Sequence, residues 1–600
     1  MRVWQPGSHL VSNRSTRVED WSWAATRRRV TALYRLARPY RLRTTIAIIS
    51  LLAATAASLA PPLLIGKAVD AVSDGHSGSL RLLVVLFVVA SVVGTVCSYA
   101  QTYFTGWTGE RMLADLRHHL FSHLQRLSLD FYEQNRAGVL ISRLTNDVEA
   151  LDELVTDGFT SLIQNTLTLL GAAVILLFLS WRLALAMIVV LPALSVATAI
   201  FRKKSSRSYR GVRETLGAVT ATLAEDIAGI RVLQAFTRER QARAHFRQVG
   251  EAYRVKNQET VVQNALYFPT VDLLSSIATA IILGYGGYLV FDGHTEIGVL
   301  VSFLGYSANF FDPVQQLSQL YSTFLTAVAA LDKIMEVLAV EPRVTDAPGA
   351  ATLGRLRGHV RFRDVHFSYR RGAEVLHGID LDVPAGTTVA LVGHTGAGKS
   401  TIAKLIARFY DPTEGAITID GVDLRSVRQE SLRGQLGIVP QEGFLFAGSL
   451  AENIAFGRPS ATRAEILAAA GAVGVDEFVA TLPERYDTEL GERGYRLSLG
   501  QRQLVAFARA LLADPRILIL DEATSSVDIG AERRIEQALR RLLHGRTAFI
   551  IAHRLSTIRN ANMIVVLEEG RIAEQGSHDE LLGRGGAYAE LYGRWAADVA

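Results

Sequence analysis

The sequence has a single cysteine, Cys97, among its 600 residues. One thiol can form neither a disulfide within the chain nor a cysteine-rich metal site, so both are excluded. Because Cys97 directly follows the apolar residues 92–96, we interpret it as a small hydrophobic side chain.

Charged residues are also scarce, at 20% of the chain against 49% hydrophobic residues. The net charge of +5 arises mostly from arginines near the predicted membrane borders, so it does not indicate nucleic acid binding. Residues 1–37 are arginine-rich, and we expect no cleavable signal there because the first long apolar run begins only at Thr44. We expect a cytoplasmic lead-in, either an interfacial helix or a frayed tail.

Residues 38–338 consist mainly of long apolar runs. A helix needs roughly 20 apolar residues to cross a bilayer, and these runs are long enough. We place six membrane helices near 44–66, 81–104, 159–180, 183–201, 266–291 and 297–322. Their connections alternate between short segments poor in arginine and two long, arginine-rich segments. The positive-inside rule therefore puts both termini and both long segments on the cytoplasmic side of a cell membrane.

The two long segments, 105–158 and 202–263, contain few turn residues and are expected to be helices that leave the membrane. Each contains a short stretch that is a candidate for contact with another part of the protein. These stretches are residues 128–135 in the first segment and 229–236 in the second.

Polar residues in the last predicted span recur every seven positions, as Ser302, Asn309, Gln316 and Thr323. They form a stripe along one helix that either faces a cavity or forms a hydrogen-bonded seam with another helix. Carboxylates are costlier to bury than amides, so Asp272 and Asp312 are the sharper candidates for contact with a substrate or proton. Either could instead pair with an arginine at the inner border. We predict a substrate cavity lined by Asp272, Asn309, Asp312 and Gln316.

The composition changes at residues 339–357, a linker rich in proline, glycine and alanine. In the following domain, 358–600, buried strands alternate with helices, which predicts a parallel α/β core. Residues 360–369 alternate as an edge strand would, and residues 460–481 are expected to be helical.

Residues 393–400, GHTGAGKS, match the P-loop pattern, and they follow an apolar strand and open a helix predicted at 401–409. The alternative, a chance glycine turn, does not explain this context. Backbone N–H groups would hold phosphate, Lys399 would reach the outer phosphates, and Ser400 would ligate Mg²⁺. The predicted ATP-binding residues of this segment are Gly393, His394, Thr395, Gly396, Ala397, Gly398, Lys399, Ser400 and Thr401.

A second apolar strand, residues 517–520, ends in Asp521 and Glu522. Asp521 is placed to hold Mg²⁺ and Glu522 to polarise an attacking water. Two acids after a strand could instead cap a helix.

Further motifs follow in a fixed order: HFSYR with Tyr369, the P-loop, VPQE with Gln441, TELGERG, LSLGQRQ at 497–503, ILILDE, SSVD at 525–528 and IIAHR with His553. With six spans ahead of them, they make the chain from about Arg38 onward resemble a half-transporter of the ATP-binding cassette (ABC) exporter family. The resemblance implies an ATP hydrolase coupled to transport, with ATP and Mg²⁺ as cofactors.

The resemblance also implies residue roles. Tyr369 would stack on adenine, Gln441 would reach Mg²⁺, and His553 would contact the γ-phosphate, although alone each could be structural. Ser498, Leu499, Gly500 and Gln501 would act on nucleotide held by a partner chain, and Asp528 would lie in a loop at the dimer interface. Residues 128–135 and 229–236 would dock onto nucleotide domains.

One position departs from the family pattern, because Leu499 stands where the signature usually has glycine. Leucine adopts positive φ only at a cost and carries a side chain toward the phosphate. The chain therefore resembles the subunit of heterodimeric multidrug or lipid exporters that supplies the catalytic P-loop, and we favour a heterodimer over a homodimer. The expected function is export of a small amphipathic, drug-like or lipid-like substrate. The alternatives are an importer on this scaffold, as for siderophores, and a nucleotide-gated channel or regulator.

Overall fold

The computed structural model describes residues 27, 29, 31, 34–369, 372–441, 443–491, 494, 496–521, 529–552 and 554–599. These residues form two compact units. The first contains the chain up to Gln125 and Ala137–Val340, and the second contains Arg126–Arg136 and Glu341–Ala600.

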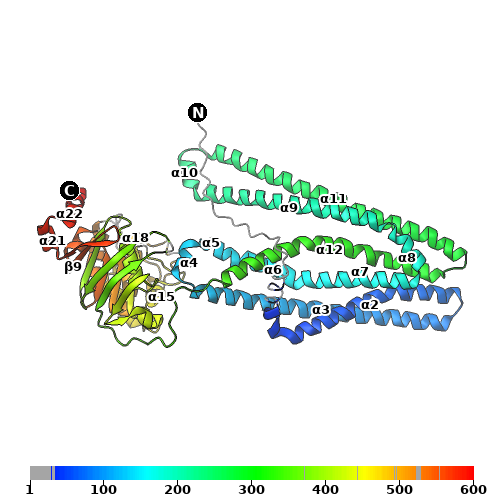
Figure 1. The fold of residues 1–600 in the computed structure, drawn as a ribbon, viewed down its shortest axis with the longest axis horizontal. Coiled ribbons are helices and arrows are strands. Elements are labelled where there is room, and N and C mark those ends of the chain that lie inside the picture. Colours follow the sequence, from blue (N-terminus) through cyan, green and yellow to red (C-terminus); the bar gives the residue numbers. More distant parts are fainter. Residues whose placement is uncertain are drawn as a thin grey trace. The chain divides into compact units, whose positions relative to one another are not determined.

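The first unit is helical (Figure 1). Its helices are η1 (Arg38–Tyr40), α2 (Arg41–Ser73), α3 (Ser77–Arg126), α5 (Ala137–Ser142), η2 (Arg143–Asp147), α6 (Val148–Asp152), η3 (Glu153–Gly158), α7 (Phe159–Leu179), α8 (Trp181–Ile188), α9 (Leu191–Ala228), α10 (Ile230–Ala235), α11 (Glu239–Phe291) and α12 (Ile297–Leu338). Among the described residues five helices are long and apolar enough to cross a membrane, and a bent pair, α8 and α9, makes a sixth span.

The fourth span is not the continuous helix that we predicted over 183–201, because α8 and α9 meet at a bend of 41°. Pro192 lies in the first turn of α9. Proline has no N–H to donate, and its ring clashes with the carbonyl four residues earlier, here that of Ile188, the last residue of α8. The proline therefore accounts for the position of the break.

Helices α2 and α12 approach closely through two glycines. The Gly298 N–H donates to Asp70 Oδ1 over 2.6 Å, and a Cβ added at Gly298 would lie 2.1 Å from the carbonyl oxygen of Gly66. Small residues permit such contacts between helices in a membrane, where packing rather than water exclusion drives association. The aromatic side chains of Phe303 and Tyr306 on α12 are fully buried in the core that α12 shares with neighbouring helices.

The second unit contains a six-stranded sheet in the order β10-β9-β3-β8-β7-β6. All neighbouring pairs are parallel except β9 and β10, which confirms the predicted parallel α/β core. The strands are β3 (Thr388–Gly393), β6 (Leu436–Val439), β7 (Ile517–Asp521), β8 (Thr547–Ile551), β9 (Met563–Glu568) and β10 (Arg571–Gly576). The middle strands are buried on both faces and are therefore continuous apolar runs.

A second sheet, in the order β2-β1-β4-β5, corrects one expectation. Its strands are β1 (Val360–Phe367), β2 (Leu376–Val383), β4 (Glu414–Ile419) and β5 (Val422–Asp423). Strand β1 pairs with β2 on one side and β4 on the other, so it is not an edge strand. Its alternation arises because only one face is buried, a property that a central strand of an antiparallel sheet also has.

The helices of this unit are α4 (Leu129–Gln134), α13 (Lys399–Ile406), η4 (Leu424–Ser426), α14 (Gln429–Arg433), α15 (Leu450–Ala455), α16 (Arg463–Ala472), α17 (Asp476–Val479), η5 (Arg485–Asp487), α18 (Leu499–Ala513), α19 (Ile529–Leu543), α20 (Leu555–Arg559), α21 (His578–Arg584) and α22 (Ala587–Val599). The helix predicted at 460–481 is therefore two helices, separated at Gly474 with φ of 80°. The helix after the P-loop ends at Ile406 rather than Phe409, because Arg408 adopts a φ of 49°.

Candidate functional site

The candidate nucleotide site is built at the carboxyl edge of four neighbouring parallel strands. Leu391 on β3 is level with Ile551 on β8, and Ile551 is level with Asp521 on β7. One strand further, Val439 ends β6 and Gln441 follows two residues later. Ligands of open α/β sheets bind at this edge. The register thus brings the P-loop, Asp521 and Gln441 from distant parts of the sequence to one edge.

The P-loop starts on a position that only glycine can occupy. Gly393 has a φ of 144°, and a Cβ there would lie 2.2 Å from the carbonyl oxygen of Leu567 on β9. The loop then enters α13 through Gly398, whose φ of 103° no other residue adopts easily. The backbone N–H groups at the start of α13 favour an anion.

Lys399, the first residue of α13, is only 7% exposed. Its ammonium donates to the carbonyl oxygens of Gly393 over 2.7 Å and His394 over 2.9 Å. Burial lowers the pKa of Lys399, and the nearby carboxylate of Asp521 opposes that effect. The lysine and the aspartate are therefore close enough to interact, as their predicted roles around one phosphate group require.

Tyr369 lies beside the first turn of α13, where its hydroxyl is 2.9 Å from Thr401 Oγ1. Its ring makes edge contacts with Phe367 and Tyr410, at centroid distances of 4.9 and 5.2 Å. The structure thus fixes Tyr369 next to the P-loop helix, and stacking on adenine remains a prediction.

The oxygen donors predicted for Mg²⁺ fit that ion in kind. Mg²⁺ is usually held by one or two carboxylates together with waters and substrate phosphates. Ser400, which is exposed, Gln441, also exposed, and the half-buried Asp521 supply a hydroxyl, an amide and a carboxylate at one sheet edge. Among the described residues no group of three His, Cys, Asp or Glu side chains could hold a metal ion.

The signature residues form the start of α18. The Ser498 side chain accepts from the Gln501 N–H, and the Gln501 side chain accepts from the Ser498 N–H, which together make a capping box. Leu499 is the first residue of the helix and has no positive φ, so our expectation of backbone strain there was wrong. A helical position accepts leucine readily. What distinguishes it from glycine is only its half-exposed side chain.

Three predicted site residues, Glu522, His553 and Asp528, lie outside the described residues. Glu522 directly follows the last residue of β7, and His553 is the second residue after β8. Their roles remain predictions that depend on sequence position alone.

The polar stripe of α12 divides into two kinds of position. At its ends the side chains join helices: Ser302 is 2% exposed, and Thr323 donates to Glu153 Oε1 over 3.3 Å. Between them, Asn309 is half-buried, and Asp312 and Gln316 are exposed. Asp272 on α11 is also exposed and accepts from the Gln315 amide over 2.8 Å. The seam interpretation therefore holds for the ends of the stripe, and a cavity along its exposed middle remains a prediction.

No sequence pattern predicted the individual contacts of α4 within the second unit. Glu133 accepts from Lys404 Nζ over 2.7 Å and from the Tyr410 hydroxyl over 2.8 Å. Burial opposes ionisation of Glu133, but these two hydrogen bonds outweigh it and keep the pKa of Glu133 below its usual value. The other short element, 229–236, forms α10 in the first unit, and its docking remains a prediction.

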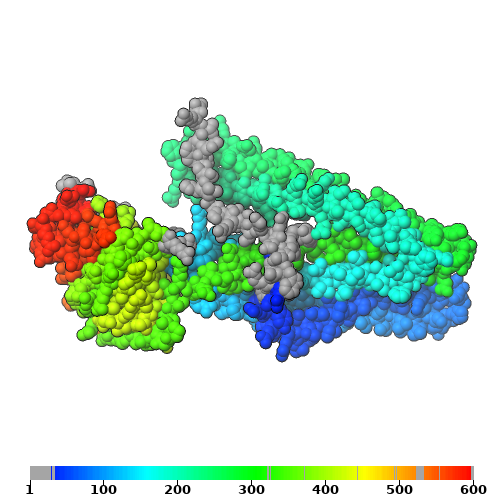
Figure 2. Space-filling model, viewed as in Figure 1, coloured from blue at the N-terminus to red at the C-terminus, as the bar shows by residue number. Residues whose placement is uncertain are grey.

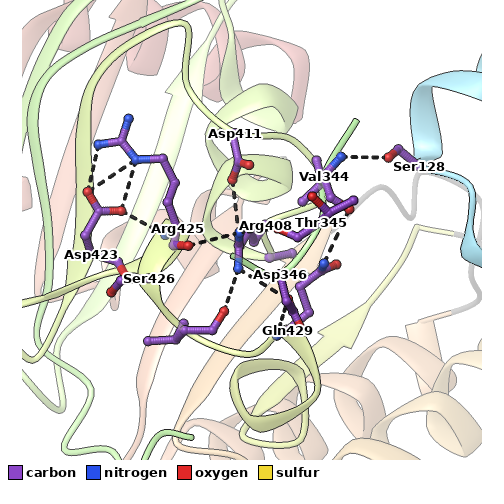
Figure 3. A network of polar contacts seen from close by, with 12 residues as sticks. Ser128, Val344, Thr345, Asp346, Arg408, Asp411, Asp423, Arg425, Ser426 and Gln429 are labelled. Atoms are coloured by element: carbon purple, nitrogen blue, oxygen red, sulfur yellow. Dashed lines mark hydrogen bonds and ion pairs between the residues drawn. The ribbon is translucent and has the colours of Figure 1, made fainter. Parts of the chain in front are cut away.

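A buried arginine holds the linker beside α4 (Figure 3). Arg408 is 1% exposed and donates to the carbonyl oxygens of Val427 and Thr345 over 2.7 and 3.1 Å. One linker residue further back, the Val344 N–H donates to Ser128 Oγ over 3.0 Å. The local sequence ARFYDP contains no motif from which these hydrogen bonds of Arg408 could be predicted. Its positive φ is visible only in the structure.

Comparisons with known proteins agree with this geometry. The family described as ABC transporter transmembrane region matches residues 44–314, and the family described as ABC transporter matches residues 376–525. An uncharacterized ABC transporter ATP-binding protein of Bacillus subtilis is 43% identical over 92% of each chain. An ATP-dependent lipid A-core flippase of Syntrophus aciditrophicus is 38% identical over 93% of each chain. The solved structure of a bacterial Atm1-family ABC exporter with ATP bound is similar with a TM-score of 0.78 and 34% identity, covering 93% of this chain and 99% of that chain.

Proposed function

This chain belongs to the ABC transporter family and hydrolyses ATP to drive transport, and we propose that it exports an amphipathic, lipid-like or drug-like compound. The observation that carries the proposal is the exposed polar stretch of α12. Asp312 and Gln316 lie within the last candidate membrane span and are exposed in the single chain. Such residues are costly in a membrane unless they face water or a substrate. The similarity to a lipid A-core flippase supports a substrate with an apolar part.

At the nucleotide site, Lys399 would exchange the carbonyls of Gly393 and His394 for phosphate oxygens of ATP, while the N–H groups that open α13 hold the same phosphates. Ser400, Gln441 and Asp521 would hold Mg²⁺, which neutralises charge as the terminal phosphate leaves. Glu522 would orient the attacking water and His553 the γ-phosphate. Tyr369 would provide a ring face for adenine.

The chain carries one membrane domain and one nucleotide domain, so it works as a dimer. We favour a heterodimer, in which a partner with an intact signature completes the site of this chain. The Leu499 side chain supports this assignment, since in a homodimer it would face the nucleotide in both sites. The orientation with both termini cytoplasmic, in a cell membrane, follows from the arginine distribution.

The test is ATP-dependent transport in oriented vesicles with the nucleotide domains outside. Export predicts that a fluorescent phospholipid or drug moves into the lumen only when ATP is added. The Glu522→Gln variant should bind ATP without moving substrate. Counterflow of labelled substrate toward the nucleotide domains would instead identify an importer, and an ATPase rate of zero with a permeable membrane would identify a channel.

A further inference from the structure

A cavity of about 340 Å³ lies between the start of α2, the middle of α3 and the start of α7. Its lining includes Thr44 and Ala47 on α2, Thr108 and Met112 on α3, and Phe159 and Ile163 on α7. None of the described residues that line it is charged. The volume falls within the range of roughly 300–1,000 Å³ typical of small-molecule sites. This cavity shares no residue with the polar stretch of α12.

One polar group that lines this cavity, the Thr108 hydroxyl, is buried without a hydrogen-bond partner among the described residues. Thr108 is only 6% exposed. Two other threonines of the lining are satisfied, because Thr44 donates to the Tyr40 carbonyl and Thr160 to the Thr156 carbonyl. A buried hydroxyl without a partner is costly, so Thr108 is available to a hydrogen-bond acceptor that the described residues do not supply.

Arginines and aromatic rings gather one helical turn away on the same two helices. Arg43, four residues before Ala47, places its guanidinium 3.4 Å from the centre of the Trp107 ring. Arg111, three residues after Thr108, lies 5.8 Å from the same ring. Residues three and four apart share a helix face. Arg43 therefore lies on the face of α2 that lines the cavity, and Arg111 on the corresponding face of α3. Asp115 accepts from the Tyr40 hydroxyl and lies near the same tyrosine as Arg43 and Arg111, so two arginines and a carboxylate gather there.

We propose that this cavity binds one acyl chain of an anionic phospholipid. The chain fills the apolar cavity, the Thr108 hydroxyl donates to the ester carbonyl, and Arg43 and Arg111 face the phosphate. Arg111 follows Thr108 by three residues, a rise of about 4.5 Å along α3, which suits the short distance between a lipid ester and its phosphate. Tryptophan and arginine together mark a membrane interface. With the proposed orientation, the lipid comes from the cytoplasmic leaflet, on the side of the start of α2, which is coloured dark blue in Figure 2.

The experiment places the whole chain in nanodiscs of phosphatidylcholine that contain phosphatidylglycerol with a diazirine in one acyl chain. After irradiation, peptide mapping should find adducts on the lining segments of α2, α3 and α7, and unlabelled phosphatidylglycerol should compete. Ala47→Phe fills the cavity and should abolish these adducts. Ala56→Phe places the same ring on an exposed position of α2 and should leave them unchanged.

Two further variants keep the test informative if Ala47→Phe misfolds. Thr108→Val preserves shape and should weaken competition about fivefold, the effect of one hydrogen bond. Its control, Thr95→Val, removes an exposed hydroxyl on the same helix and should have no effect. Arg43→Gln with Arg111→Gln should remove the preference for phosphatidylglycerol over phosphatidylcholine. Adducts spread evenly over exposed α3, insensitivity to Thr108→Val, or equal labelling by a phosphatidylcholine probe would each overturn the proposal.

Discussion

A single side chain, that of Lys399, links the P-loop to the rest of the candidate site. It is buried, it donates to two carbonyls of its own loop, and it lies near the carboxylate of Asp521, the last residue of β7, two strands away from β3. ATP must therefore displace existing hydrogen bonds of the lysine before it is held. The contribution of Lys399 to ATP affinity is then the difference between its hydrogen bonds to phosphate and its present hydrogen bonds to the two carbonyls.

Lys399→Ala and Glu522→Gln should separate binding from chemistry. Loss of the lysine removes charge-assisted hydrogen bonds to phosphate and should weaken ATP binding roughly 10- to 100-fold. Loss of the general base should instead slow hydrolysis about 10²- to 10⁴-fold while ATP remains bound. Equilibrium binding of a fluorescent ATP analogue and phosphate release measure the two effects. Lys256→Ala, at an exposed ion pair on α11, is the control. Equal losses of affinity in both variants would contradict the assigned roles.

Asp312→Asn should change which substrates stimulate ATP hydrolysis and leave the basal rate nearly unchanged. The carboxylate is exposed on α12 beside Gln316, far along the sequence from the P-loop. The readout is ATPase activity in lipid across a panel of amphipathic compounds, with Asp292→Asn at an outer turn as the control. If stimulation by every compound stays the same, Asp312 has only a structural role.

At the scale of elements, the short helix α4 belongs to the nucleotide unit although the chain around it belongs to the membrane unit. Its contacts are polar and specific: Ser128 with the linker backbone, and Glu133 with Lys404 and Tyr410. We predicted a short contact element at 128–135 within a long helical segment, and its docking onto a nucleotide domain from the family resemblance. It could not identify the residues that α4 contacts, since these are 271 and 277 positions away.

Glu133→Gln should loosen α4. The Glu133 and Lys404 side chains are 39% and 31% exposed, so solvent screens the pair and we expect a loss of about 1 kcal/mol. Hydrogen exchange of residues 128–135 should then become about fivefold faster. Because the pKa of Glu133 is held below its usual value of 4.5, the contact persists at neutral pH and weakens only as the pH falls through that lowered value. Glu251→Gln, at an exposed pair on α11, should leave this exchange unchanged. Unaltered exchange in Glu133→Gln would show that the pair contributes nothing.

Other elements show which features of the fold follow from local sequence patterns and which do not. The apolar runs and the P-loop predicted long helices and a parallel sheet because burial and phosphate geometry both leave local patterns. The central place of β1 did not follow from its alternation, since strand order depends on pairing between distant segments. The break between α8 and α9 could have been predicted, because Pro192 lies within the span.

For the assembled transporter, we propose that the identity of the partner subunit sets the ATPase activity. Leu499 keeps a normal helical backbone, so the signature folds, and only its side chain distinguishes it from glycine. Purified alone in lipid, the chain should hydrolyse ATP slowly, and co-expression with a half-transporter that has an intact signature should restore turnover. Leu499→Gly, at a cost of about 1 kcal/mol of helix stability, should raise the rate of the chain alone. Robust ATPase and transport from the unmodified single chain would exclude an obligatory heterodimer.

The position of α4 also constrains how the protein is made. Glu133 leaves the ribosome 271 residues before Lys404, and at about 5–20 residues per second this takes roughly 15 to 55 s. During that interval the membrane helices α7 to α12 are being synthesised while the surface that receives α4 does not yet exist. Domains cannot simply fold one after another along this chain. The nucleotide domain completes its own structure by taking up a segment made long before it, so a nascent chain arrested ahead of Lys404 exposes α4 to chaperones and proteases.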